Sequence, residues 1–226
     1  MKFWFKGKEN NEPNKILETG WQFYHRPTTL EPIGTVFRID SDNKRFDVDT
    51  LDIPSTRGLE SESHLESNKD INLGAFLKIL SVSPKIGGNA NLAEKVEFQM
   101  RQPERETTKD SDVDKILEPY LKSMKYRTDN RYFLIRACYW ASGMTYRLSK
   151  DRLLDLGGEG KINEALGVQA NLKTVGESMY EIDHAFPQPM RVMFLPEEIK
   201  VTSAGLGGDE AQLGRVQVRE QLVWKD

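Results

Sequence analysis

Cysteine and histidine are scarce in this sequence of 226 residues, which has one cysteine, Cys138, and three histidines. A single cysteine excludes an internal disulfide and every metal site built on several cysteines, and it favours a reducing, cytosolic location. His25, His64 and His184 are dispersed, and no two of them have the i, i+4 spacing that would place both imidazoles on one metal. We therefore expect neither a metal site nor a catalytic histidine.

Nucleotide-binding and nucleophile motifs are also missing. In LGGEGKI, Asp155 stands where a phosphate-binding loop requires its first glycine, and Ile162 stands where a serine or threonine would bind magnesium. GLGGD lacks the third glycine of the dinucleotide fingerprint. Cys138 lies in an apolar stretch, where thiols are usually buried and inert. The sequence therefore predicts no cofactor and no enzyme.

Long hydrophobic runs are absent as well. No stretch approaches the ~18 apolar residues of a spanning helix, and the opening MKFWFKGK has no apolar core of signal-peptide length. Apolar residues make up 38% of the chain and charged residues 30%, which is typical of a folded protein in water. The formal net charge of -3 gives no overall positive field to attract nucleic acid. We expect one domain over residues 1–226.

Alternating apolar residues, by contrast, are frequent. The segments that predict strands are TVFRID and KRFDVDTLDI, which suit a hairpin, then INLGAFLKILSVS, KVEFQM, YFLIRACYWASGMTYRL, VQANLKTV, PMRVMFL and RVQVREQLVW. Apolar residues at 3.6-residue spacing predict a helix from Ser111, Asn14–Thr19 suits a short helix, and the polar stretch 56–70 predicts a surface loop. We therefore predict an α+β fold, a twisted, largely antiparallel sheet with a few packed helices.

Two features of this pattern bear on organisation. In YFLIRACYWASGMTYRL the even positions from Leu134 to Leu148 predict one apolar stripe, interrupted at Arg136 and Ser142. The glycine-rich SAGLGGDEAQLG precedes the last predicted strand. Residues 206–226 therefore form either a regulatory tail or a terminal strand.

The order of these segments resembles the amino-terminal, pore-forming domain of the gasdermin family from Gly20 to about Lys200. INLGAFLKILSVSPKIGGNANLAEKVEFQM followed by SDVDKILEPYL is similar to the family's glycine-rich stretch, phenylalanine-centred strand and following helix. GWQFYHRPTTLEPIGTVFRI, RYFLIRACYWASGMTYRL and VQANLKTVGESMYEIDHAFPQPMRVMF resemble its lead-in, second strand pair and closing strand. The resemblance implies a gasdermin-like fold and a protein that oligomerises and permeabilises membranes.

In that family two central stretches leave the soluble sheet and become transmembrane hairpins. A spanning strand needs ~9 to 11 residues with one apolar face, and Ile71–Val82 and Tyr132–Leu148 both satisfy this. The resemblance therefore implies these membrane hairpin residues: Ile71, Leu73, Leu77, Ile79, Val96, Phe98, Leu134, Trp140, Met144, Tyr146, Val168 and Leu172. The same alternation suits strands packed on a water-soluble core, so the pattern alone does not distinguish the two.

The N-terminus mixes aromatic and basic residues, a composition suited to the interface of an anionic bilayer. The predicted lipid-binding residues are Lys2, Phe3, Trp4, Phe5, Lys6 and Lys8. Their alternative role is a first strand with its aromatic side chains in the core. We expect acidic phospholipids and further copies of the chain as partners, with a cytoplasmic resting form and an active form at the plasma membrane.

The activating event has two interpretations. Short bacterial members of the family carry a lipid-modified cysteine at the start, which this sequence lacks, so the resemblance to fungal gasdermin-like regulators of cell death is closer. Those regulators are switched on by a sister allele product, which implies a hetero-oligomer with a related gasdermin-like chain and a role in allorecognition. Proteolytic removal of the tail is the alternative trigger, and a non-lytic intracellular binding module is the alternative function.

Overall fold

The computed structural model describes residues 20–59, 70–72, 95–123, Arg127, 129–149, 170–202, 212–218 and Leu222. These residues form an 11-stranded sheet and one helix, α4 (Asp110–Ser123). All the recorded strand pairs are antiparallel. The predicted α+β class with a largely antiparallel sheet is therefore confirmed. The helix expected over Asn14–Thr19 lies outside the described residues.

Two long strands form the spine of the sheet. They are β8 (Arg131–Ser149) and β10 (Met179–Thr202), and they pair from Tyr132 opposite Ile199 to Ser149 opposite Met179. The long strand predicted in the apolar run that ends near Leu148 is thus confirmed. β10 extends well beyond the predicted PMRVMFL segment in both directions.

Shorter strands line both edges of this spine in three successive tiers. The helix tier, named for the helix that covers it, has the strand order β3 (Arg45–Thr50), β2 (Thr35–Ile39), β8, β10 and β11 (Gln212–Gln217). The middle tier has the order β4 (Ser55–Leu59), β7 (Glu104–Thr108), β8, β10 and β1 (Gln22–Thr28). The distal tier has the order β5 (Asp70–Asn72), β6 (Lys95–Arg101), β8, β10 and β9 (Ala170–Val175).

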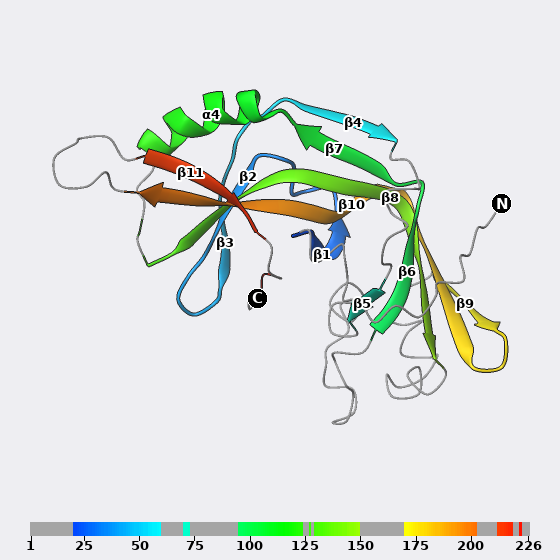
Figure 1. Ribbon diagram of the computed structural model, residues 1–226. Helices are drawn as coiled ribbons and strands as arrows, with labels where there is room; N and C mark the ends of the chain where they lie inside the picture. The colour runs from blue at the N-terminus through cyan, green and yellow to red at the C-terminus, as the bar shows by residue number, and fades with distance from the viewer. Residues whose placement is uncertain are drawn as a thin grey trace.

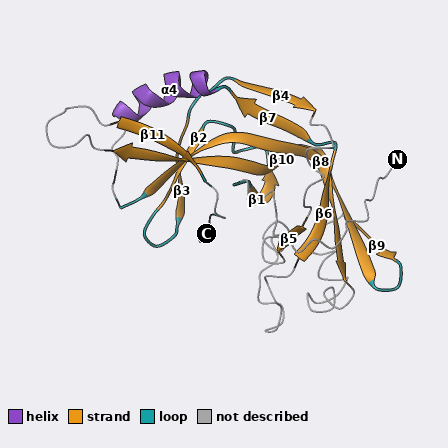
Figure 2. Cartoon of the chain, in the orientation of Figure 1, coloured by secondary structure: helices purple, strands orange, loops and turns teal. Residues whose placement is uncertain are grey.

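The helix tier is covered on one face by α4, as Figure 2 shows. Val113 and Leu117 of α4 are buried against Leu134 of β8 and Ile199 of β10. The 3.6-residue spacing of apolar side chains in α4 places them on the side that faces the sheet. The helix predicted from Ser111 is therefore confirmed, and it begins one residue earlier.

A second cluster covers the opposite face, and the end of the chain contributes to it. Val218 and Leu222 are buried there with Phe133 and Phe194. The packing is tight, because a Cβ placed on Gly20 would lie 1.7 Å from the carbonyl oxygen of Val218. Residues Gln212–Gln217 thus form strand β11, and Val218 and Leu222 belong to the core.

The spine turns sharply between the middle and distal tiers, so that β6 and β9 lie below the rest of the sheet in the view of Figure 1. Here Ala185 faces Gly143 and Met190 faces Ala141, so β10 has three more residues than β8 between these pairs. The extra residues lie in the segment Phe186–Pro189, which contains two prolines that cannot donate ladder hydrogen bonds. This bulge separates the distal tier from the rest of the spine.

Two sequence expectations are corrected. The segment predicted as a loop over 56–70 begins with strand β4, which pairs with β7 although none of its five residues is buried. The stripe predicted from Leu134 along the even positions is interrupted, since Leu134 packs under α4 while Cys138 belongs to the opposite cluster. A register shift near Arg136, between Leu195 and Pro196 of β10, exchanges the two faces of β8.

Candidate functional site

The distal tier collects several of the predicted hairpin residues into one apolar row. Phe98 of β6 faces Tyr146 of β8, Tyr146 faces Ile182 of β10, and Ile182 faces Leu172 of β9. The first three of these side chains are buried and Leu172 is half-buried. Directly opposite residues of antiparallel strands lie on the same face, so the row runs unbroken across four strands.

A second row on the same face is also largely apolar. Met100 faces Met144, Met144 faces His184, and His184 faces Ala170. Met100 and Met144 are buried. These two methionines lie beside the row that contains Phe98 and Tyr146. This face of the sheet is therefore strongly apolar, and the methionine side chains can adapt their packing. Ile71 of β5 pairs with Val96 of β6 at the outer edge of the tier.

The residues between these rows are polar and belong to the other face. Glu97, Arg147, Glu181 and Lys173 face one another in succession across β6, β8, β10 and β9. Arg147 and Glu181 form an ion pair with 3.3 Å between Nη2 and Oε2. We call these four residues the charge row. Its signs alternate from strand to strand, so every neighbouring pair is of opposite charge.

The next row on this face, nearer the bulge, is polar too. It consists of Gln99, Thr145, Asp183 and Asn171 in register. The Thr145 hydroxyl donates to Asp183 Oδ1 at 3.0 Å, and Arg101 Nη2 lies 3.3 Å from the same oxygen. The distal tier therefore has one apolar face and one polar face, and this alternation continues through four adjacent strands.

Close packing at the bulge fixes where the distal tier begins. A Cβ placed on Gly143 would lie 2.6 Å from the carbonyl oxygen of His184 and 2.5 Å from Arg101 Nη2. Glycine is therefore required for β10 and the Arg101 guanidinium to approach β8 this closely. Phe23 of β1, in the middle tier, packs against the apolar face of the distal tier. Its ring centroid lies 5.3 Å from that of Phe98 in an edge-to-face contact.

The other predicted hairpin residues are placed elsewhere. Leu134 lies in the helix tier under α4. Trp140 lies in the middle tier, where its indole Nε1 donates to Glu106 Oε2 at 2.7 Å. The remaining predicted residues lie outside the described part of the chain: Leu73, Leu77, Ile79 and Val168 of the hairpins, and Lys2, Phe3, Trp4, Phe5, Lys6 and Lys8 of the lipid-binding segment.

Trp140 is the centre of a polar cluster that ties the middle tier together. The guanidinium carbons of Arg57 and Arg191 lie 4.0 and 4.1 Å from its ring centroid. Arg57 also pairs with Glu104, and Arg191 donates to the carbonyl oxygen of Thr29 at 2.9 Å. Cation–π contacts of this kind contribute about 0.5–1 kcal/mol each when exposed and more when desolvated. The cluster joins β4, β7, β8 and β10 to the segment after β1.

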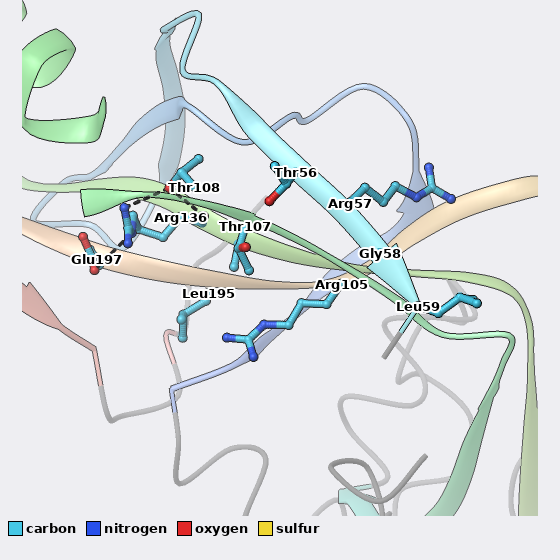
Figure 3. Close-up of a pocket in the computed structure, with 11 residues that line it drawn as sticks. Thr56, Arg57, Gly58, Leu59, Arg105, Thr107, Thr108, Arg136, Leu195 and Glu197 are labelled. Carbon is cyan, nitrogen blue, oxygen red and sulfur yellow. Dashed lines mark hydrogen bonds and ion pairs between the residues drawn. The ribbon is translucent and has the colours of Figure 1, made fainter. Parts of the chain in front are cut away.

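A pocket of about 620 Å³ lies beside this cluster, between β4, β7 and the spine (Figure 3). Gly58 faces Arg105 across β4 and β7, and the space a Gly58 side chain would occupy is open. Arg57 and Arg105 point away from each other in this view. Arg136 in the lining is already neutralised, by Asp110 at 2.8 Å and Glu197 at 3.4 Å. Arg105 is the lining cation that stays available to an anionic group, since the described residues offer it no ion pair.

Burial changes the acidity of the single thiol. Cys138 Sγ lies 3.2 Å from the Tyr24 hydroxyl in the cluster opposite α4. Loss of solvation raises the pKa of the Cys138 thiol to about 12, although the hydrogen bond with Tyr24 opposes the change. Burial raises the pKa of Tyr24 as well. A thiol of this kind stays protonated and unreactive at neutral pH, as its apolar sequence context predicted.

Comparison with solved structures identifies the architecture. A bacterial gasdermin from Bradyrhizobium tropiciagri superposes with a TM-score of 0.54 and 11% sequence identity, over 89% of this chain and 88% of that chain. The fold is gasdermin-like. No family model and no curated protein sequence matches the chain. The gasdermin-like fold expected from the sequence is thus confirmed.

Two absences apply to the residues that the structure describes. No helix among them is both long enough and apolar enough to cross a membrane. No group of three or more metal-ligating side chains occurs among them either.

The sequence patterns did not predict two features of the distal tier. The charge row joins residues from four strands, and only their register shows that opposite charges face one another. The bulge had a local signal, because the two prolines of AFPQPM are incompatible with regular pairing of a central strand. The alternation of Tyr146, Arg147 and Leu148 in the sequence also places Arg147 on the face opposite the two apolar residues.

Proposed function

We propose that this chain is a pore-forming protein of the gasdermin type, which permeabilises membranes and catalyses no reaction. The observation that carries the proposal is the distal tier, where one face has apolar rows and the other has polar rows through four strands. The gasdermin-like fold supports it independently. Most soluble sheets bury one face, but here the two-faced segment is set apart from the rest by a bulge.

In the active form the apolar rows face lipid and the polar rows face a water-filled lumen. A transmembrane strand needs ~9 to 11 residues, and β8 and β10 have 19 and 24. Backbone groups at an open sheet edge would be unsatisfied in lipid, so copies of the chain must close into a ring. Phe98, Met144, Tyr146, Ile182 and Leu172 then exchange their packing in the protein for contact with acyl chains.

The segment Lys2–Lys8 docks the resting, cytoplasmic form to acidic phospholipids of the plasma membrane. Aromatic side chains favour the headgroup region, and each lysine near an anionic surface contributes about 1 kcal/mol. The docking step concentrates the chain on the membrane and precedes assembly. It predicts that permeabilisation depends on anionic lipid and weakens at high salt.

A related gasdermin-like chain is the proposed trigger, as in an allorecognition system. The other trigger, removal of residues 206–226, is less favourable because it would take away β11 and two buried core side chains, Val218 and Leu222. A partner that displaces an edge strand of the distal tier would leave this core intact. Assembly would then begin from a folded chain.

Dye release from liposomes tests the proposal. The full chain, alone and with a related chain, is added to vesicles of neutral lipid and to vesicles that contain acidic phospholipid. Release from the acidic vesicles alone is the expected result. Release that ignores lipid charge would remove the docking step, and intact vesicles under every condition would favour a non-lytic binding module with the same fold.

A further inference from the structure

The two ends of the charge row carry opposite charges, and they lie on β9, an edge strand of the distal tier, and on β6, which only the three-residue strand β5 separates from the other edge. Glu97 occupies the register position on β6, and Lys173 occupies it on β9. Lys173 is exposed, and no ion pair of its side chain is recorded within the described ranges. An assembly that placed these two edges side by side would therefore bring a cation and a carboxylate together.

Among the described strands, β9 forms the other edge of the distal tier. β9 pairs with β10 on one side, and among the described strands nothing pairs with its other side. Its residues Asn171, Lys173 and Thr174 are exposed. An unpaired edge strand is a template for pairing with another chain.

The edge at β6 is occupied by a short and poorly matched strand. β5 has three residues, and its Asp70 stands opposite Glu97 in the register. Two acidic residues at directly opposite positions destabilise a strand pair. The pairing of β5 with β6 is therefore the weakest-matched contact along the charge row.

The direction of β9 allows the β9 strand of a second copy to take the place of β5 beside β6. β5 is antiparallel to β6. β9 also runs antiparallel to β6, since β6, β8, β10 and β9 alternate in direction across the tier. The β9 strand of a second copy can therefore take the place of β5 on β6 without breaking the antiparallel order.

We propose that β9 of one copy pairs with β6 of the next, displaces β5, and places Lys173 opposite Glu97 of its neighbour. This inference rests on the proposed pore-forming function and names the contact that assembles the ring. The contact is heterologous, so repeating it generates a ring when the rotation closes. Across the contact, the alternation of charge along the row continues from one copy into the next.

The same register matches the other rows. With Lys173 opposite Glu97, Leu172 stands opposite Phe98 of the neighbour and Asn171 stands opposite Gln99. Apolar residues thus meet apolar residues, and polar residues meet polar ones. A shift by one residue would reverse the faces of every strand in the next copy. A shift of β9 by two or four residues along β6 would keep the faces matched. The charge row distinguishes among these shifts, because only the in-register contact pairs Lys173 with Glu97.

Charge reversal tests the contact. K173E places two acidic residues opposite each other at every junction, and E97K places two lysines there. Like charges at an interface are strongly unfavourable, so we expect each variant to release dye from acidic vesicles roughly tenfold more slowly or worse. An equimolar mixture should recover release, because alternating the two variants pairs opposite charges at every junction. K115E, an exposed position on α4, is the control for loss of a lysine and should match the wild type.

Disulfide cross-linking provides a test that does not depend on charge. Within one chain, positions 97 and 173 are separated by three strand spacings, about 14 Å, which is too far for a disulfide. A K173C/E97C variant can therefore cross-link only between copies. We expect a ladder of oligomers after oxidation on acidic vesicles, monomer in solution, and little ladder for N171C/E97C, which is offset by two residues. Single-cysteine variants control for the buried Cys138.

The outcomes separate this inference from the proposed function. If the wild type permeabilises vesicles but K173C/E97C gives no ladder, or K173E is as active as the wild type, the contact is wrong and pore formation stands. If the wild type never permeabilises vesicles, both fail. Melting curves recorded for E97K and K173E, whose new side chains face Arg147 and Glu181 in their own chains, identify any loss caused by misfolding, and the cross-linking result then decides.

Discussion

Lysine substitutions at either of two neighbouring positions of β9 test which rows of the distal tier face the membrane and which face water. Leu172 and Asn171 are adjacent on this edge strand and lie on opposite faces. L172K puts the charge on the apolar row beside Ile182, and N171K puts the same charge on the polar row beside Asp183. In the resting chain Asn171 is exposed and Leu172 is half-buried on an edge strand, so neither change should lower the melting temperature by more than about 2–4 °C.

The two variants should differ greatly in the membrane. A lysine on the lipid face of a transmembrane strand costs about 2–4 kcal/mol near the bilayer midplane. At 1.4 kcal/mol per factor of ten, this weakens insertion of each chain by roughly 30- to 700-fold. The penalty recurs in every chain of the ring. We therefore expect L172K to release almost no dye from acidic liposomes while N171K remains close to the wild type.

Equal activity of L172K and N171K would refute the assignment of the apolar row to lipid. Reduced activity of N171K alone would mean that the two faces are exchanged. Sedimentation with the same liposomes separates docking from insertion, since both variants should still bind acidic vesicles. A loss of binding in L172K would move the effect to the docking step.

Three further outcomes follow from the rest of the fold. Replacing Trp140 by leucine should lower the free energy of unfolding in urea by about 2–3 kcal/mol, because two cation–π contacts and the hydrogen bond to Glu106 are lost; unchanged stability would contradict the cluster's role. Burial raises the pKa of Cys138 to about 12 from an ordinary 9.0, so only the unfolded state loses the thiol proton between these values. Stability should therefore fall as pH rises above 9, and C138A should flatten that dependence in a pH series of melting curves. G143A should lower the melting temperature by an amount that corresponds to about 1–3 kcal/mol, because its methyl group would press on the backbone of β10.

Local patterns were sufficient for elements whose own residues carry a clear periodic signal. The β2–β3 hairpin followed from two alternating segments with a turn between them, and α4 followed from the spacing of Val113 and Leu117. β8 was predicted as a long strand because its apolar run exceeds the length of an ordinary core strand. Each of these elements carries its signal within its own residues.

Elements defined by distant partners were not predictable in this way. β4 is STRGL, a polar strand without alternation, and it is held by its ladder with β7 some fifty positions later. The bulge near Arg136 moves Cys138 to the face opposite Leu134, and no residue type in that stretch marks the shift. The charge row depends on the register of four strands. Tertiary pairing determines all three, which is why period-2 counting missed them.

Truncation of the chain after residue 205 tests whether removal of residues 206–226 activates the protein. The deletion removes six register pairs between β10 and β11 and the hydrogen bond from Leu222 N to Gln22 Oε1. It also removes Val218 and Leu222 from the core, where burial of each contributes about 1.5–3 kcal/mol. The summed loss of about 3–6 kcal/mol is a large part of the ~5–15 kcal/mol that stabilises an ordinary domain.

We therefore expect the truncated chain to aggregate or melt at a much lower temperature, and to lack any gain in dye release. A deletion confined to the last two residues, which follow Trp224, is the matched control and should behave as the full chain. A truncated chain that stays folded, shows a normal melting curve and lyses acidic vesicles faster would contradict this expectation. It would make tail removal the activating event, because loss of β11 would then free the edge of β10 without cost to the core. Activation by a related chain requires the opposite, a core that β11 keeps intact while the distal tier changes partners.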